Sequence, residues 1–553
     1  MGRWFEKQNY FVKCLFYSSI FSLLMSSIMN VAFYKYIISL GLQLYLIIFC
    51  FFILFFNYLA IFFLLLNNHL KYFACLLFFL SIFAEYYMVF CETPISPGII
   101  KSIFETSFNE AFEILEPKLI VFCIFIAIIM LFIFSKIKLP KISLYKTLLI
   151  HFSGCILFFS LGFLLIGFNY SKLAVFAKQS IIGYYINIDN FLFGTFKVGK
   201  KYFQKPKVLK ILDENPFKKN NNKNHFVVLF VGETSRKSSF SLNGYKRKTN
   251  PMLEKHDIIN FKYATSCGTY TAYSLPCMFS FKTRKNFKES ELNENVLQIL
   301  VKAGVDVTWY ENDDNSSKNQ AKGKGIEYIN LRSEKSPLCD KKRCYDEIAL
   351  QKIKNEIVKF SGKIDNKINL TNNDKKTYIK NNNNTSAIKD KIVVFHMIGS
   401  HGPLYYKRYP RKWAKFQPEC MEANPSVCSI EELKNAYDNT ILYQDFVLSE
   451  TIDLLSEMKK KHENTDISMI YISDHGESLG EKGAFLHAFP YALAPKEQTE
   501  IPFIIWTSNN VLKNKFLSFS DKSVSHDNLS HTLLGIFDIS SVVKDDKLDL
   551  TNL

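Results

Sequence analysis

Three residues of the C-terminal part of this chain have the types needed for metal chemistry. Asp474 and His475 are adjacent, and Glu233 lies far upstream in the motif Gly232-Glu-Thr. Two carboxylates and an imidazole form an O/O/N ligand set that suits Zn²⁺. A hydroxyl at the fourth ligand position would have its pKa lowered and its oxygen aimed for attack. An Asp-His pair alone fits an ordinary loop hydrogen bond equally well, so the elements that carry these residues matter.

Threonines and histidines supply the other candidate groups. Thr269 and Thr271 lie between Cys267 and Cys277, and Thr234 follows Glu233. Spacing alone would allow Thr269 as readily as Thr271 for the hydroxyl. His401, in Gly-Ser-His-Gly-Pro, and His487, in Phe-Leu-His-Ala, would more often be structural if each stood alone.

Apolar runs typical of buried strands precede these motifs. Strands are predicted at 226–230, 305–310, 392–396, 469–472 and 501–506. Helices are predicted at 293–303, 345–360, 430–461 and 528–537. This alternation predicts an α/β fold with a largely parallel sheet. Functional residues of such sheets gather at the carboxyl ends of strands, where Glu233, His401 and Asp474 are expected.

The N-terminal part is apolar enough to span a membrane. Five stretches have the required length: 12–34, 43–66, 72–90, 119–135 and 147–168. Buried helices of a soluble protein are the alternative, but residues 44–66 contain no charged side chain. Lysine and arginine are concentrated before the first span and between the fourth and fifth, which should therefore be cytoplasmic. Residues 91–118 and the C-terminal part should lie on the opposite side.

The cysteines give a second indication of compartment. Of the twelve, six form close pairs in the C-terminal part: Cys267 with Cys277, Cys339 with Cys344, and Cys420 with Cys428. Three local disulfides in an oxidising compartment are expected, because the spacing of a zinc-thiolate site is missing. In a bacterium this compartment is the periplasm.

Charge and hydropathy describe two unlike parts. Mean hydropathy is near zero, because residues 1–168 form the predicted transmembrane domain and residues 225–553 the polar catalytic domain. Residues 169–224 should connect them, with a helix on the membrane surface, and residues 365–390 should form an exposed Asn/Lys-rich insertion. Two interpretations of the net charge of +17 are a surface that is simply rich in Lys and Asn, and a surface that is attracted to an anionic membrane. No nucleic-acid motif accompanies it.

Several motifs together resemble the bacterial phosphoethanolamine transferases, the lipid A modifying enzymes that include the mobile colistin-resistance proteins. They are Val231-Gly-Glu-Thr-Ser-Arg236, the segment 265–280, Gly399-Ser-His-Gly-Pro403, Asn435-Ala-Tyr-Asp-Asn439 and Ser473-Asp-His-Gly-Glu477. The resemblance covers nearly the whole chain. It implies an alkaline-phosphatase/sulfatase-like fold for the catalytic domain, and a multi-pass protein of the bacterial inner membrane.

The resemblance also assigns roles to residues. It implies zinc held by Glu233, Thr271, Asp474 and His475, with Thr271 as the nucleophile. One zinc would be tightly held, and a second remains open near His401 and His487. The residues expected to contact substrate are Thr269, Asn315, Ser316, His401, His487, Thr106 and Glu110. Lys318 and Lys322 cannot be aligned with the family, because the sequence departs at residues 311–315.

The implied reaction transfers phosphoethanolamine from phosphatidylethanolamine through a phospho-threonine, with release of diacylglycerol. The acceptor would be a lipid A phosphate, while a core sugar, a glycan or a periplasmic protein stays open. A phosphoglycerol transferase or phosphodiesterase of the same fold is the alternative enzyme. A sulfatase is disfavoured, because the Arg of its Cys/Ser-x-Pro-x-Arg motif is missing. A non-catalytic membrane receptor is the alternative from another class.

Overall fold

The fold is taken from a computed structural model of the full chain. It describes residues 10–39, 50, 53–55, 57–58, 70–90, 94–96, 99–101, 117–136, 182–187, 194–196, 199, 208–219, 223–313, 320–321, 323–340, 343–373, 390–422, 425–481 and 484–552. The chain divides into two compact units. The first comprises residues 1–101 and 115–204, and the second comprises residues 102–114 and 205–553.

The first unit is helical in the residues described. Its helices are α2 (Tyr10–Ser27), α3 (Val31–Ser39), α5 (Leu70–Phe90) and α8 (Pro117–Lys136), with the 3₁₀ helices η1 (Ile28–Asn30) and η3 (Ile182–Tyr185). The helical stretch Phe16–Ile38 is long and apolar enough to cross a bilayer, whereas Cys75–Val89 and Ile120–Ile133 are shorter apolar helices. Many apolar side chains of α8, including Val121 and Phe132, are exposed, as expected for helices that face lipid.

The predicted spans are tested only in part. Helices coincide with the spans predicted at 12–34, 72–90 and 119–135. The span predicted at 43–66 lies largely outside the described residues, and the span at 147–168 lies wholly outside them. A five-span topology therefore stays a prediction.

The second unit contains a seven-stranded sheet. The strand order is β3-β11-β8-β2-β7-β5-β6. β8, β2, β7, β5 and β6 are parallel to one another, and β11 is antiparallel to both β8 and β3. The strands are β2 (Asn224–Gly232), β3 (Ile259–Asn260), β5 (Asp306–Glu311), β6 (Ile326–Asn330), β7 (Lys391–His396), β8 (Thr465–Ser473) and β11 (Phe503–Thr507). The largely parallel sheet agrees with the α/β fold predicted.

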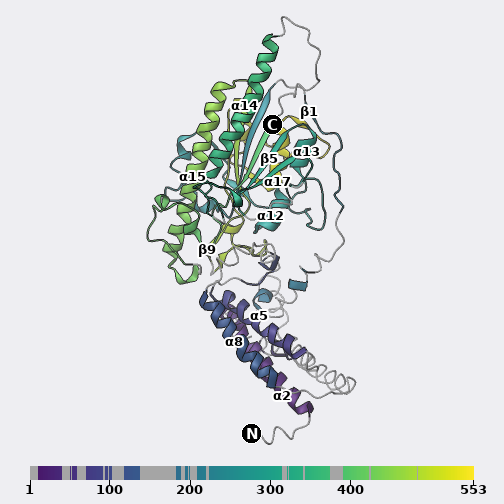
Figure 1. The fold of residues 1–553 in the computed structure, drawn as a ribbon, viewed down its shortest axis with the longest axis vertical. Helices are drawn as coiled ribbons and strands as arrows, with labels where there is room; N and C mark the ends of the chain where they lie inside the picture. Colours follow the sequence, from purple (N-terminus) through teal and green to yellow (C-terminus); the bar gives the residue numbers. More distant parts are fainter. Residues whose placement is uncertain are drawn as a thin grey trace. The chain divides into compact units, whose positions relative to one another are not determined.

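Helices cover both faces of this sheet (Figure 1). One face carries α14 (Ile348–Asn373) and α15 (Ile430–Lys461), and the other carries α12 (Thr271–Met278), α13 (Val296–Lys302) and α17 (His526–Ile536). The side chains of β2 alternate between two hydrophobic cores: Phe226, Val228 and Phe230 belong to one, and the residues between them belong to the other. Every side chain from Phe226 to Val231 is fully buried, which explains why this strand reads as a continuous apolar run.

Smaller elements complete the unit. They are α16 (Asn510–Leu517) and the two-stranded pairs of β1 (Phe217–Lys218) with β13 (Ile539–Ser540), β9 (Ser478–Glu481) with β10 (Ala484–Leu486), and β4 (Tyr263–Thr265) with β12 (Ser523–Ser525). β1 lies in the predicted connector, so the end of that segment pairs with the last strand of the catalytic unit. α14 continues to Asn373, so the predicted Asn/Lys-rich insertion at 365–390 begins as helix. Residues 374–389 lie outside the described residues.

Candidate active site

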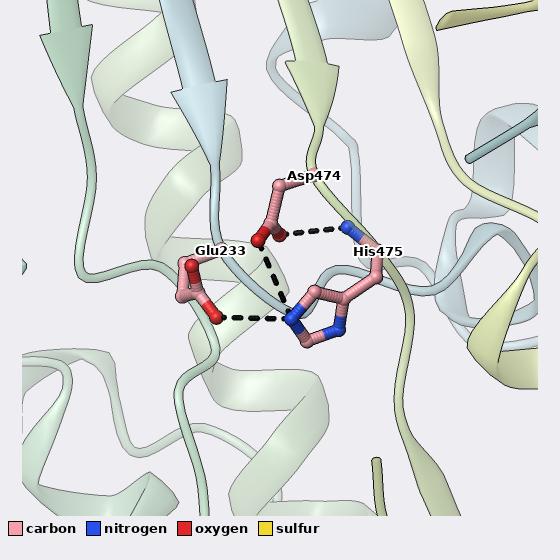
Figure 2. Close-up of side chains that lie close together, drawn as sticks. All are labelled: Glu233, Asp474 and His475. Carbon is pink, nitrogen blue, oxygen red and sulfur yellow. Dashed lines mark hydrogen bonds and ion pairs between the residues drawn. The ribbon is translucent and has the colours of Figure 1, made fainter. Parts of the chain in front are cut away.

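The register of two neighbouring strands places Glu233 beside Asp474. β2 and β8 are parallel, and their last residues, Gly232 and Ser473, are paired. The next residue of each strand therefore emerges at the same edge of the sheet. His475 follows directly, and all three candidate ligands are fully buried. Figure 2 shows the three side chains converging at the carboxyl ends of the strands.

The carboxylate of Asp474 is held on one side and left open on the other. Its Oδ1 accepts hydrogen bonds from the backbone N–H of Thr234 at 3.2 Å and of His475 at 2.7 Å. Its Oδ2 is buried and has no hydrogen-bond partner among the described residues, and it lies 3.3 Å from His475 Nε2. A buried oxygen without a partner lowers the stability of the folded state, and a cation bound to this atom would remove that cost.

The ring of His475 presents a lone pair to the carboxylates. Its Nδ1 donates to the carbonyl of Gly476 at 2.9 Å, which leaves Nε2 as the acceptor in the neutral tautomer. Nε2 lies 3.3 Å from Glu233 Oε1. A ring nitrogen fixed through its other N–H is the usual arrangement for a histidine that binds a metal.

Thr271 contributes the fourth group. Its Oγ1 lies 3.0 Å and 3.1 Å from the two oxygens of Glu233 and 3.3 Å from His475 Nε2. Ligand atoms bonded to zinc at about 2.0–2.1 Å in a tetrahedron are separated by roughly 3.3 Å. The separations of Thr271 from Glu233 and His475, and of His475 from Glu233 and Asp474, are close to that spacing. The donor set and its geometry therefore fit a tetrahedral zinc ion.

The electrostatics of the three buried groups point the same way. Burial, and then the charge of Glu233, raise the pKa of Asp474 to about 8. Burial opposes the protonated form of His475, but the charges of Asp474 and Glu233 raise its pKa to about 9. Without a cation, protons must therefore be held among these groups. A divalent ion would replace those protons and neutralise the carboxylates.

The other two threonine hydroxyls lie in different surroundings. Thr269 donates to the carbonyl of Phe489 at 2.6 Å and is committed to that contact. Thr234 adopts a positive φ of 53°, and its hydroxyl has no hydrogen-bond partner among the described residues. Only Thr271 is within hydrogen-bond distance of both Glu233 and His475, which favours it as the nucleophile.

Further buried charged groups lie next to Glu233. His396, at the end of β7, lies 3.6 Å from Glu233 Oε2, and its Nδ1 lies 2.8 Å from Glu311 Oε1. Burial lowers the pKa of His396, but the charge of Glu311 and the contacts with Glu233 and Asp313 together raise the pKa well above its usual value. Glu233, Asp313 and His396 also lie close enough together to hold a cation.

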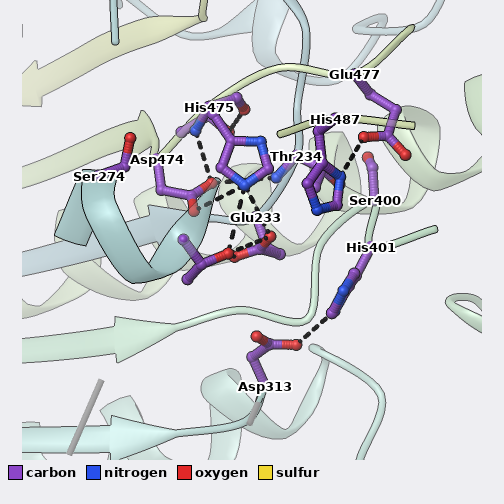
Figure 3. Close-up of polar contacts among 12 residues, drawn as sticks. Glu233, Thr234, Ser274, Asp313, Ser400, His401, Asp474, His475, Glu477 and His487 are labelled. Atoms are coloured by element: carbon purple, nitrogen blue, oxygen red, sulfur yellow. Dashed lines mark hydrogen bonds and ion pairs between the residues drawn. The ribbon is translucent and has the colours of Figure 1, made fainter. Parts of the chain in front are cut away.

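The two predicted substrate histidines border the site (Figure 3). His401 Nδ1 lies 2.9 Å from Asp313 Oδ1, and His487 Nδ1 lies 2.7 Å from Glu477 Oε2. The rings of His487 and His475 are 4.6 Å apart between centroids, and those of His487 and His401 are 6.2 Å apart. Both histidines are partly exposed, at 21% and 17% of their side chains, so a substrate phosphate could reach them.

Comparisons with known proteins agree with this geometry. Residues 225–539 match the sulfatase family, and residues 48–203 match the family described as phosphoethanolamine transferase EptA/EptB. Phosphoethanolamine transferase EptA of Escherichia coli K12 is 31% identical over 480 residues, which cover 84% of this chain and 82% of that protein. The chain belongs to the phosphoethanolamine transferase family.

Solved structures extend the likeness to both units. The integral membrane protein lipooligosaccharide phosphoethanolamine transferase A (EptA) of Neisseria meningitidis matches with a TM-score of 0.83 and 29% identity, over 96% of this chain and 97% of that one. The C-terminal periplasmic domain of the phosphoethanolamine transferase EptC of Campylobacter jejuni is 37% identical, with a TM-score of 0.51, over 62% of this chain and 98% of that one.

Disulfides join all three predicted cysteine pairs of this phosphoethanolamine transferase. They are Cys267–Cys277, Cys339–Cys344 and Cys420–Cys428. The first clamps the segment that carries Thr271, because Cys277 lies within α12. Among the described residues, the cysteines without a disulfide are Cys50, Cys75 and Cys123, all in the helical unit.

Four predicted substrate residues cannot be placed. Thr106, Glu110, Asn315 and Ser316 lie outside the described residues, as do Lys318 and Lys322. Sequence analysis missed the buried groups Glu311, Asp313, His396 and Glu477. Each stands at or just after a strand end, and that position is the signal that could have singled them out.

Proposed function

We propose that this phosphoethanolamine transferase moves phosphoethanolamine from phosphatidylethanolamine to a lipid A phosphate or a related envelope acceptor, through a phospho-threonine at Thr271. The observation that supports it is the convergence of the Thr271 hydroxyl with Glu233 and His475 at 3.0–3.3 Å. The name of the Neisseria relative, a lipooligosaccharide phosphoethanolamine transferase, supports the acceptor class.

Glu233, Thr271, Asp474 and His475 would hold the zinc ion. When bound there, zinc supplies a Lewis acid that lowers the pKa of the Thr271 hydroxyl and offsets phosphoryl charge. The Thr271 hydroxyl, which donates a hydrogen bond to Glu233, would lose its proton to that side or to solvent as Oγ1 forms a bond to phosphorus and the bond from phosphorus to the diacylglycerol oxygen breaks. The leaving oxygen needs a proton, and the partly exposed His401 and His487 are placed to donate it.

The second half of the reaction regenerates Thr271. An acceptor phosphate oxygen forms a bond to phosphorus, and the bond from phosphorus to Thr271 Oγ1 breaks. A phosphate acceptor is already anionic and needs no general base. The product carries a cationic amine on the acceptor, which would lower the anionic charge of the cell surface and weaken binding of cationic peptides such as polymyxins.

The proposal includes a membrane location. Residues 1–168 would form a five-span inner-membrane domain, residues 169–224 a connector at the membrane surface, and residues 225–553 the periplasmic catalytic domain. Three disulfides in the second unit fit an oxidising compartment. The Neisseria relative is an integral membrane protein, and the C-terminal domain of the Campylobacter relative is periplasmic, which supports the same arrangement.

The test is turnover of phosphatidylethanolamine by the purified full chain in detergent with zinc. The Thr271→Ala variant should release no diacylglycerol above background, because it has no oxygen to attack phosphorus. The Thr271→Ser variant should retain measurable release. Thr451→Val is the matched control, since this buried hydroxyl donates to the carbonyl of Val447 within α15 and not to the ligand set.

Mass spectrometry of the trapped protein identifies the transferred group. A phosphoethanolamine adduct on the peptide that contains Thr271 supports the proposal. A phosphoglycerol adduct would instead establish the related phosphoglycerol transfer. Diacylglycerol release by Thr271→Ala at the wild-type rate would refute the nucleophile assignment.

A further inference from the structure

A buried histidine outside the ligand set connects the two loops that carry the nucleophile and the ligand pair. His526 is the first residue of α17 and is 1% exposed. Its Nδ1 lies 3.0 Å from the backbone nitrogen of Cys267, and its Nε2 lies 2.8 Å from the carbonyl oxygen of Ser473. Cys267 lies four residues before Thr271, and Ser473 directly precedes Asp474.

The roles of the two ring nitrogens follow from their partners. A backbone N–H only donates and a carbonyl only accepts, so Nδ1 accepts from Cys267 and Nε2–H donates to Ser473. Burial lowers the pKa of His526 to about 4, so the ring stays neutral at the pH of the periplasm. Both hydrogen-bonding nitrogens of the neutral imidazole, one donor and one acceptor, therefore have a partner.

Each loop is also fixed on its other side. The N–H of Asp474 donates to the carbonyl of Gly232 at 2.8 Å, so the peptide between Ser473 and Asp474 is held by hydrogen bonds at both of its polar ends. On the other loop, the N–H of Gly268 donates to Ser274 Oγ at 2.9 Å, and the disulfide Cys267–Cys277 closes the turn. His526 is the link between the two assemblies.

We propose that His526 is a positioning residue that sets the distance between the Thr271 hydroxyl and the Asp474–His475 ligand pair. The proposal rests on the function proposed above for Thr271 and zinc. His526 touches neither the substrate nor the metal ligands' side chains. It acts through one backbone group of each loop, so that β8 and the nucleophile segment move as one body.

Two amide substitutions separate its two contacts. In His526→Asn the side-chain amide reaches the position of Nδ1, so it can accept from Cys267 but loses the bond to Ser473. In His526→Gln the amide reaches the position of Nε2, so it can donate to Ser473 but loses the bond to Cys267. Asn should therefore loosen the ligand loop, and Gln should loosen the nucleophile loop.

The same helix offers a matched control. His531 is also 1% exposed, and its Nδ1 accepts from the backbone N–H of Asp545 at 2.9 Å. That contact lies in the C-terminal segment and involves no residue of the candidate site. His531→Asn therefore reproduces the change of a buried histidine on α17 without touching either loop.

Zinc affinity and turnover are measured on the full chain in detergent, by competition with a metal-binding dye and by diacylglycerol release at saturating zinc. We expect His526→Asn to weaken zinc binding by roughly tenfold or more, as changes around metal ligands do. We expect His526→Gln, which displaces only Thr271 among the four ligands, to weaken zinc binding less than His526→Asn does, but to lose roughly 10–100-fold in kcat at saturating zinc, because misplacement of a nucleophile by about 1 Å has that effect. His531→Asn should change neither, even where it lowers Tm.

Wild-type zinc affinity and kcat in both His526 variants would overturn the proposal. So would equal losses in His531→Asn, which would reduce the effect to general destabilisation. The dye competition needs no turnover. A wild-type chain that binds zinc but releases no diacylglycerol would therefore refute the proposed reaction while the zinc measurement still tests His526.

Discussion

Replacement of Asp474 by asparagine should stabilise the zinc-free chain and reduce the stabilisation that zinc provides. The amide has the shape of the carboxylate, and its oxygen can keep the two backbone hydrogen bonds that Oδ1 accepts from Thr234 and His475. Its nitrogen takes the place of Oδ2, which lies 3.3 Å from His475 Nε2. The variant thus removes a buried titratable group and leaves the packing unchanged.

The size of the effect without zinc follows from the pKa of Asp474. Burial, with the charge of Glu233, raises it from 3.8 to about 8. The folded state therefore binds this proton more tightly than the unfolded state, so stability falls as pH rises from about 4 to about 8. At pH 7 the interval is about three pH units, which at about 1.4 kcal/mol each sets an upper bound of about 4 kcal/mol on the destabilisation. The bound is upper because the charge of Asp474 raises the pKa of His475, which returns part of that free energy. Asparagine carries no such penalty.

Zinc narrows the difference. At a zinc concentration a thousand times Kd, binding stabilises the folded wild-type chain by about 4 kcal/mol. Loss of a ligand should weaken Kd by at least the 10–100-fold typical of changes around a site, and a hundredfold loss leaves only about 1.4 kcal/mol at the same concentration. The variant should therefore gain about 2.6 kcal/mol less from zinc than wild type does.

Unfolding by denaturant, followed by tryptophan fluorescence, measures both effects. Three of the four tryptophans, Trp309, Trp413 and Trp506, lie in the second unit, so most of the signal reports the unit that contains the site. Wild type and Asp474→Asn are compared at pH 4 and pH 7, each with EDTA or with excess zinc. The reasoning is refuted if the EDTA-treated variant is no more stable than wild type at pH 7, or if its advantage is as large at pH 4.

Two further predictions concern the elements that hold the site. Gly399 has a φ of +51°, and a Cβ there would lie 2.7 Å from the carbonyl oxygen of Glu233. Gly399→Ala should therefore cost about 1–2 kcal/mol from the left-handed backbone alone and lower kcat by roughly tenfold or more by displacing Glu233; an active variant of unchanged Tm would contradict this. Paired Cys267→Ser and Cys277→Ser substitutions should destabilise the second unit by about 2–4 kcal/mol, as measured by denaturant unfolding. They should lower kcat and change KM little, because Thr271 lies inside the closed loop. A rise in KM with unchanged kcat would contradict this prediction.

Sequence reasoning succeeded where a single strand contains both the apolar run and the polar motif that indicate a site. The runs that form β2, β7 and β8 are buried on both faces, so they read as continuous apolar segments with a polar motif at the end. Because parallel strands end at the same edge of a sheet, Glu233 and Asp474 could be expected together without knowledge of the register. In the structure Gly232 pairs with Ser473, so the residues that follow them, Glu233 and Asp474, leave the sheet side by side.

It failed where a residue acts through a partner far away in the chain. Glu311 and His396 come from different strands, β5 and β7, and the contact that matters is the 2.8 Å ion pair between them. Glu311 stands in a sequence that also contains Asn312 and two aspartates, so no local pattern distinguishes it. Similarly, α14 continues into the Asn/Lys-rich segment, because helix propagation needs no apolar residues beyond those already packed.

The choice among the threonines shows the limit most clearly. Thr269 and Thr271 are two residues apart in a segment without periodicity, and only the start of α12 at Thr271 separates their environments. The strands supply two candidate ligands of the site, but the proposed nucleophile comes from a helix on one face of the sheet, and nothing in the strand order fixes its distance from them. That distance depends on long-range links, of which the 259-residue separation between Cys267 and His526 is one. A chemical motif can therefore be recognised from sequence at strand ends, whereas the spacing that makes it reactive has to be read from the structure.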